Sequence, residues 1–174
     1  TAKYALVPEN YLIANYYSNM AVHHFYHRAF IELALLKARK EKPDDRESVL
    51  WQEIMNLRSL FKFEFFYSKK VIFSEECEID LQYLDPNWHK KLNSTPKQIE
   101  GMLSKQNILT SSVVLSTYVE AYKVVAKSLL SLDSNQGYTD DELLSACVFY
   151  GEEMHWKGKI HRVESVSKPF LLNG

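Results

Sequence analysis

Residues 12–35 read LIANYYSNMAVHHFYHRAFIELAL, and this stretch decides the fold class. Its large apolar side chains recur at steps of three and four residues, which is the period of an α-helix. The same pattern extends in both directions, so the sequence predicts one long helix over residues 8–40. Pro8 suits the first turn of such a helix, because a backbone N–H is not needed there.

A second helix is predicted over residues 45–66, with Asp44 or Asp45 as its cap. Its expected buried face repeats at helical spacing and comprises Leu50, Ile54, Leu57, Phe61 and Phe65. Residues 71–73 read Val-Ile-Phe. Such a short apolar run fits either a strand or a buried connection, and both remain open.

The second half of the chain is also predicted to be helical. Short helices are expected over residues 78–90 and 95–105, followed by a long helix over residues 109–132. The side chains expected to be buried in that long helix are Val113, Tyr118, Ala121, Tyr122, Val125, Leu129 and Leu130. Thr139 and Glu142 have the spacing of a capping box, which begins a helix that ends near His155. A last short helix begins at Ser165 or Ser167.

These elements predict an all-α protein, an irregular bundle of three or four long helices with short helices between them. The chain has 174 residues, of which 46% are hydrophobic. That is enough for one domain with a sizeable core, so we expect a single helical domain over residues 1–174. Because the chain starts with Thr1 rather than Met, we expect it to be a segment of a longer protein.

The charge balance excludes one class of partner. Lys and Arg number 21 against 22 Asp and Glu, which gives a net charge of -1. A protein held to nucleic acid by its charge is expected to be basic, so nucleic acid is not an expected partner. No apolar run approaches the roughly 18 residues that span a bilayer, and we expect the segment itself to be soluble.

Four residues form an alternative metal site. His23 and His27 share one helical face, and Glu152 and His155 form a Glu-x-x-His pair of the kind found in di-iron helical bundles. A complete site of that kind needs two such pairs and two further glutamates, whereas the sequence contains one pair. The main expectation is therefore no metal and no cofactor, with these histidines bonded to buried polar partners.

The sequence also offers no convincing nucleophile. Cys77 lies between Glu76 and Glu78, whose charges disfavour a thiolate, and Cys147 lies in an apolar helical stretch typical of a core. No Gly-x-Ser-x-Gly sequence and no glycine-rich phosphate loop occurs. We therefore expect no catalytic residue in this chain.

Residues 60–67 read LFKFEFFY and are unusually rich in aromatic side chains. A helix there would place Phe61 and Phe65 inward and leave Phe63 and Phe66 on other faces. Two interpretations remain open: a deeply buried core segment, or a surface that contacts another domain or a membrane interface.

Residues 16–25 read YYSNMAVHHF and resemble a stretch of the glycerol-3-phosphate acyltransferase family, which includes the dihydroxyacetone-phosphate acyltransferases. The positions that match the family pattern are Tyr16, Tyr17, Asn19, His23 and Phe25. In the family this stretch lies just beyond the acyltransferase domain.

Three later segments are similar to the same family. Residues 60–66 match a Leu-x-Lys-x-Glu-hydrophobic-Phe pattern through Lys62 and Glu64, and residues 119–125 match a helix of the family through Glu120 and Tyr122. Residues 158–169 are similar to the C-terminal tail of bacterial members. The resemblance implies that these residues have structural or domain-docking roles.

The resemblance implies acyl transfer from an acyl thioester to glycerol 3-phosphate in phospholipid synthesis. In the family a His-x-x-x-x-Asp motif supplies the general base and its orienting carboxylate. None of the six histidines here is followed by Asp at that spacing, and only His27 is followed by an acid, Glu32. We therefore expect a non-catalytic C-terminal region that supports a catalytic domain outside this chain.

The expected partners follow from that assignment. They are the protein's own catalytic domain, which binds the acyl thioester and glycerol 3-phosphate, and a membrane surface at whose cytoplasmic side the whole protein acts peripherally. The acceptor could equally be dihydroxyacetone phosphate, and the acyl donor coenzyme A or a carrier protein. Two other functions stay open: a freestanding helical interaction module, and a metal-dependent helical enzyme.

Overall fold

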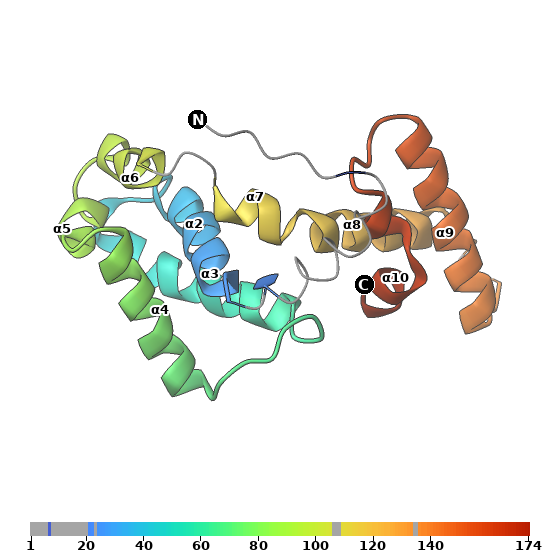
Figure 1. The fold of residues 1–174 in the computed structure, drawn as a ribbon, viewed down its shortest axis with the longest axis horizontal. Coiled ribbons are helices and arrows are strands. Elements are labelled where there is room, and N and C mark those ends of the chain that lie inside the picture. Colours follow the sequence, from blue (N-terminus) through green and yellow to red (C-terminus); the bar gives the residue numbers. More distant parts are fainter. Residues whose placement is uncertain (1–6, 8–20, 23, 106–108, 134–135) are drawn as a thin grey trace. The chain divides into compact units, whose positions relative to one another are not determined.

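The computed structural model describes residues 7, 21–22, 24–105, 109–133 and 136–174. Within these ranges the chain forms nine α-helices and no strand (Figure 1). The predicted all-α class is confirmed. Contacts divide the chain into two compact units, unit 1 with residues 1–114 and unit 2 with residues 115–174. The prediction of one domain over residues 1–174 stays a prediction.

Unit 1 begins its described helices with α2, in the numbering of Figure 1. Its elements in chain order are α2 (Tyr26–Ala38), the 3-10 turn η2 (Pro43–Asp45), α3 (Arg46–Leu60), α4 (Lys70–Leu84), α5 (Trp88–Leu92), α6 (Pro96–Ser104) and α7 (Thr110–Val114).

α2 is the central helix of unit 1, since α3, α4, α6 and α7 all pack against it. Ala29, Phe30, Ile31, Ala34 and Leu35 are completely buried. Consecutive positions such as 29, 30 and 31 point to different sides of a helix, so burial extends well beyond one stripe. α2 is therefore enclosed by its neighbours rather than laid on a surface.

A cluster of aromatic rings joins α2 to the segment after α3. The ring centroid of Phe30 lies 5.9 Å from that of Phe61 and 6.2 Å from that of Phe65. Tyr26 lies 5.2 Å from Phe65. Separations of this size are typical of favourable aromatic pairs, which add to the free energy gained by burying the rings.

The helix predicted over residues 45–66 ends at Leu60, and the chain then turns. The predicted burial of Phe61 and Phe65 is confirmed, but a turn rather than a helix buries them. Tyr67 donates a hydrogen bond from its hydroxyl to the carbonyl oxygen of Phe61 at 3.1 Å, which satisfies a carbonyl group at the helix end. Phe63 and Phe66 are 67% and 92% exposed.

The continuous helix predicted over residues 8–40 is wrong in its described part. Ala21 and Val22 are helical, but His24 and Phe25 form a turn before α2 begins. Their backbone N–H groups bond three residues back, to the carbonyl groups of Ala21 and Val22, which is tighter than the four-residue step of an α-helix. Residues 8–20 and 23 lie outside the described residues.

Residues 71–73 are neither a strand nor a connection, because they belong to α4. The buried residues of α4 are Phe73, Cys77, Leu81 and Leu84, at steps of four, four and three. This helical spacing overrides the local β preference of Val71 and Ile72, both of which point to solvent. The short helix predicted over residues 78–90 thus starts earlier, and α5 follows it separately.

Unit 2 contains α8 (Ser116–Ser131), α9 (Asp140–Trp156), the 3-10 turn η3 (Val163–Val166) and α10 (Lys168–Asn173). The helix predicted over residues 109–132 is therefore two helices, α7 and α8, divided at Leu115. The predicted burial of Tyr118, Ala121 and Val125 is confirmed. It is wrong for Val113, Leu129 and Leu130, which are exposed, and Tyr122 is half-buried.

The capping box that starts α9 is confirmed. The hydroxyl oxygen of Thr139 accepts a hydrogen bond from the backbone N–H of Glu142 at 3.3 Å, and a carboxylate oxygen of Glu142 accepts one from the backbone N–H of Thr139 at 2.8 Å. Both bonds satisfy donors that a helix start leaves unpaired. The expected short helix after residue 165 is also present as α10.

The core of unit 2 depends on a glycine in α9. The core comprises Ala121, Val124, Val125, Cys147, Ile160, Val166 and Leu171. A Cβ atom at Gly151 would lie only 2.8 Å from a Val166 methyl carbon and 3.2 Å from one of Val124. The absence of a side chain at Gly151 therefore permits this close packing.

Replacement of Phe30 tests the aromatic cluster. Phe30→Ala should lower the free energy of unfolding by about 3–5 kcal/mol, because it removes a fully buried ring and leaves a cavity. Phe66→Ala removes the same atoms from an exposed position and should change that free energy by less than about 0.5 kcal/mol. Urea unfolding followed by circular dichroism measures both; equal losses would contradict the assigned core.

Candidate functional site

The predicted motif residues near the start of the chain are only partly visible in the structure. Tyr16, Tyr17, Asn19 and His23 lie outside the described residues. Phe25 is the residue immediately before α2 and is 51% exposed. Its aromatic side chain is thus available on the surface of unit 1.

Lys62 and Glu64 lie in the turn that follows α3. The ammonium group of Lys62 is 4.6 Å from the centroid of the Phe63 ring, a cation–π distance. The backbone N–H of Glu64 donates to the carbonyl oxygen of Phe61 at 3.0 Å, which closes the turn. These two motif residues therefore shape and flank an exposed aromatic turn of unit 1.

Glu120 organises the segment of unit 2 that follows α9. Its carboxylate accepts hydrogen bonds from the backbone N–H groups of His161 at 3.1 Å and Arg162 at 2.9 Å, and from the hydroxyl of Ser165 at 3.1 Å. Bonds to an ionised acceptor are about twice as strong as neutral ones. Glu120 therefore holds residues 161–165 against α8.

Tyr122 has a packing role beside Glu120. It is half-buried against the core of unit 2. A Cβ atom at Gly174 would lie 3.0 Å from its Cδ1 atom, so the ring also contacts the C-terminal residue. Both described motif residues of α8 thus fix the position of the chain after α9.

The alternative metal site was predicted from residues of both units, and one of the four, His23, lies outside the described residues. His27 belongs to unit 1, whereas Glu152 and His155 lie on α9 and line a cavity of about 560 Å³ in unit 2. The Nδ1 atom of His155 is 3.0 Å from the carbonyl oxygen of Ile160. Since a carbonyl only accepts, Nδ1 carries the proton. Among the described residues no group of three His, Cys, Asp or Glu side chains could hold a metal ion.

A cluster of titratable groups lies beside α2. The Nε2 atom of His27 is 3.3 Å from a carboxylate oxygen of Glu76. Burial lowers the pKa of His27, and the charges of Glu76 and Asp80 oppose that effect. Burial likewise raises the pKa of Asp80, against the opposing charges of His27 and Arg28. Burial therefore favours the neutral form of both the His27 imidazole and the Asp80 carboxyl group.

Both cysteines are buried, which does not favour a reactive thiolate. Burial, together with the charges of Asp80 and Glu76, raises the pKa of Cys77 to about 12, so the thiol stays protonated at neutral pH. Cys147 is buried in the core of unit 2, as predicted. Both thiols are free.

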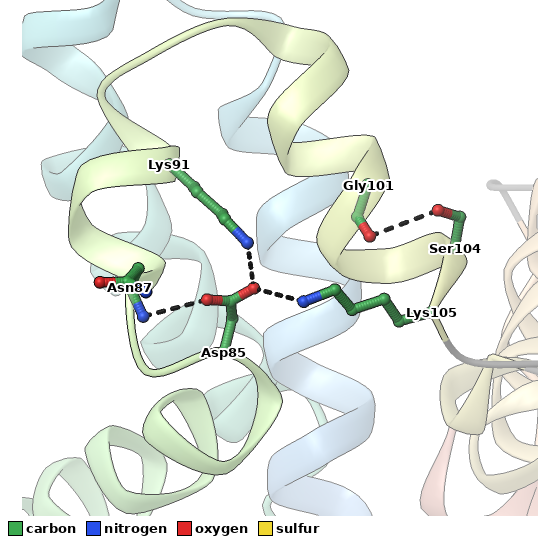
Figure 2. Close-up of polar contacts among 6 residues, drawn as sticks. All are labelled: Asp85, Asn87, Lys91, Gly101, Ser104 and Lys105. Atoms are coloured by element: carbon green, nitrogen blue, oxygen red, sulfur yellow. Dashed lines mark hydrogen bonds and ion pairs between the residues drawn. The ribbon is translucent and has the colours of Figure 1, made fainter.

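Asp85 is a buried acid that the sequence analysis did not single out. Its side chain is only 2% exposed and lies just after α4 (Figure 2). One carboxylate oxygen accepts hydrogen bonds from Lys91 and, at 2.8 Å, from Lys105, and the other accepts one from the backbone N–H of Asn87 at 3.0 Å. The bond from Lys105, followed by that from Lys91, holds the pKa of Asp85 well below its usual range.

Two further buried charges were also missed. Glu32, completely buried, accepts hydrogen bonds from Arg28 at 3.3 Å and from the backbone N–H of Ser111 at 2.8 Å. Arg46 donates to the carbonyl oxygens of Leu92 and Ser94. Of these three residues, only Asp85 has a local feature that could have been found from the sequence. Its bond from the N–H of Asn87, two residues later, forms an Asx turn.

The chain matches the family described as "Glycerol-3-phosphate acyltransferase C-terminal region" over residues 2–174. The chain belongs to this family. The resemblance stated from the motifs is therefore confirmed, while the individual roles of the motif residues stay predictions.

Proteins similar to this chain include those named "Putative acyltransferase plsB1" in Mycobacterium bovis and Mycobacterium tuberculosis. They are 25% identical to this chain over 168 residues, which is 95% of this chain and 27% of each relative. The chain thus spans about a quarter of the length of these relatives. No match was found among the solved structures. No helix in the described part of this acyltransferase C-terminal region is long and apolar enough to cross a membrane.

The pH dependence of stability tests the Asp85 cluster. Because the folded-state pKa is lowered, ionised Asp85 stabilises the fold above the unfolded pKa of about 4, and this contribution is lost as the pH falls. Asp85→Asn should cost about 1–3 kcal/mol at pH 7, and the difference from the wild type should shrink steadily below about pH 4. Urea unfolding across that range measures it. A difference independent of pH would contradict the assigned charge.

Hydrogen exchange tests the role of Glu120 in the acyltransferase C-terminal region. Glu120→Ala should speed exchange of the His161 and Arg162 amides by on the order of tenfold or more, because a bond to a charged acceptor contributes about 1.5–3 kcal/mol. Glu120→Gln keeps one acceptor and should give an intermediate rate. Glu152→Gln, on exposed α9 surface, is the control. Unchanged exchange in Glu120→Ala would refute the role.

Proposed function

We propose that this chain is the non-catalytic C-terminal region of a glycerol-3-phosphate O-acyltransferase. A catalytic domain in the rest of the protein binds the acyl thioester and glycerol 3-phosphate. It transfers the acyl group from sulfur to the acceptor hydroxyl, in phospholipid synthesis. The match to the acyltransferase C-terminal family over residues 2–174 carries this proposal.

Two observations support a non-catalytic role. The chain contains no His-x-x-x-x-Asp sequence, so it lacks the pair that accepts a hydroxyl proton in this family. The most deeply buried charges, Glu32, Arg46 and Asp85, are bonded within unit 1 and to its backbone. Charges used in this way stabilise a scaffold and do not face a substrate.

The turn after α3 is the surface we assign to contact with the catalytic domain. Phe63 and Phe66 are among the most exposed large apolar side chains of unit 1. Exposed aromatic groups beside charged residues, here Lys62 and Glu64, are typical of protein interfaces, whose anchors are often aromatic. In the whole protein these rings are buried against the catalytic domain, which keeps that domain in its active arrangement.

The membrane is the remaining partner of the proposal. A glycerol 3-phosphate acyltransferase converts a soluble acceptor into an acylated lipid, whose chain partitions into a bilayer at about 0.8 kcal/mol per CH₂ group. We therefore place the whole protein peripherally at the cytoplasmic side of a membrane.

Acyl transfer assays test the non-catalytic role. The 174-residue chain alone should give no turnover with an acyl thioester and glycerol 3-phosphate, whereas the full-length protein should be active. Formation of acylated glycerol 3-phosphate is measured with radiolabelled acceptor. Turnover by the isolated chain would overturn the proposal.

Substitution of the exposed turn tests the docking surface. In the full-length protein, Phe63→Ser with Phe66→Ser should reduce turnover by about thirtyfold or more, because each aromatic anchor of an interface contributes about 1–2 kcal/mol. Tyr83→Ser removes a side chain of unit 1 that is 84% exposed and should leave turnover unchanged. Equal turnover in all three proteins would rule out this docking surface.

A further inference from the structure

Unit 2 contains a cavity of about 360 Å³ that is lined by three lysines. Lys123 and Lys127 come from α8, and Lys159 comes from the segment just after α9. The volume lies within the range of small-ligand sites, about 300–1,000 Å³. Three lysines therefore line a space large enough for a ligand headgroup.

The described lining of this lysine pocket carries positive charge and no acid. None of the lining residues that the structure describes is an Asp or a Glu. Glu120, one turn before Lys123, accepts hydrogen bonds from the backbone of His161 and Arg162, and Glu153 is paired with Lys157. Among the described residues no ion pair is found for Lys123, Lys127 or Lys159. An anion in the pocket would relieve the mutual repulsion of the three charges.

The position of Lys159 is fixed by the way α9 ends. Gly158 has a φ of 67°, the left-handed conformation that favours glycine. The backbone N–H of Gly158 bonds to the carbonyl of His155, and that of Lys159 bonds to the carbonyl of Met154, both at 2.9 Å. This is the hydrogen-bond pattern of a Schellman motif. The third lysine is thus carried by a defined turn rather than by a loose loop.

The rest of the pocket wall is apolar or aromatic. Val124 and Ile160 are almost completely buried, and Tyr150 and Met154 of α9 are half-buried beside them. A small inorganic anion has no apolar surface, so it would gain nothing from contact with these walls. A ligand with both an anionic group and a hydrocarbon part matches them, because it gains from charge and from apolar contact together.

The surface around the pocket favours a lipid as the source of that ligand. On α8, Val119 and Leu130 are 47% and 80% exposed. At 100° per residue they lie within an arc of about 80° that also contains Lys123 and Lys127. Lysines flanked by exposed apolar side chains on one helical stripe are characteristic of a surface that lies at a membrane interface.

We propose that the lysine pocket binds the phosphate group of an anionic phospholipid presented by a membrane. Lys123, Lys127 and Lys159 contact the phosphate, while Val119 and Leu130 face the acyl-chain boundary. The site belongs to unit 2 alone, so it does not rest on the proposed acyl transfer.

Vesicle sedimentation with the full 174-residue chain tests this proposal. The chain should bind phosphatidylcholine vesicles that contain phosphatidylglycerol, and bind pure phosphatidylcholine vesicles much more weakly. Replacement of Lys123, Lys127 and Lys159 by Gln should weaken binding to the anionic vesicles by on the order of a hundredfold, given the usual contribution of a lysine at an anionic surface. Because all three side chains are exposed, circular dichroism should show an unchanged fold.

A control with the same loss of charge separates the pocket from net charge. Lys40→Gln, Lys69→Gln and Lys90→Gln together remove three exposed lysines from unit 1 and should leave vesicle binding close to that of the wild type. Equal weakening by the two triple variants would overturn the pocket. So would equal binding of the wild type to neutral and anionic vesicles.

Competition distinguishes a lipid phosphate from free phosphate. Short-chain phosphatidylglycerol should displace the chain from anionic vesicles at far lower concentration than inorganic phosphate. Equal potency of the two competitors would overturn the lipid assignment. Vesicle binding requires no acyl transfer, so its failure would leave the proposed function standing.

Discussion

The enclosure of α2 is the constraint on which unit 1 depends. Four helices pack against it, and most of its circumference is removed from water. Apolar side chains alone could satisfy such a position, but α2 also carries Glu32, which is completely buried. An unpaired buried charge is costly, so the carboxylate must find partners, and it does so at Arg28 and at the start of α7.

Charged side chains bond to connecting segments in the same way at three other places in the chain. Arg46 donates to carbonyl groups at the end of α5, Asp85 connects the end of α4 with Lys91 and Lys105, and Glu120 holds the segment after α9. Each of these charged groups bonds to a backbone group at or beyond a helix end, where regular helical hydrogen bonds stop. Charges distributed in this way stabilise the surfaces that we propose to contact a neighbouring domain and lipid.

The repeating and local features of this fold could be predicted from the sequence. Helical periodicity identified the all-α class and the burial of Phe61 and Phe65, and the spacing of Thr139 and Glu142 gave the start of α9. Local preference failed at Val71 and Ile72, where the buried stripe from Phe73 to Leu84 imposes a helix. The helix break at Leu115 carries no glycine or proline and could not be located from the sequence.

The candidate sites were also predicted only in part, because the sequence shows single motifs but not their distant partners. The motif that contains Glu120 was recognised from the sequence, but its partners at residues 161–165 are about 40 positions away and only the fold brings them together. The lysine pocket was missed for the same reason, since only the packing of α9 against α8 brings Lys159 to the same cavity as Lys123 and Lys127. Contacts between residues so far apart in the chain cannot be predicted from the local pattern of one sequence.

We propose that these helices support a catalytic domain elsewhere in the protein. The most direct measurement mixes two separately produced parts, the protein truncated before residue 1 and this 174-residue chain, and follows acyl transfer to glycerol 3-phosphate. We expect the truncated part to be weakly active alone and to gain activity as the chain is added, up to saturation. Full activity of the truncated part without the chain, with no change on its addition, would contradict the account.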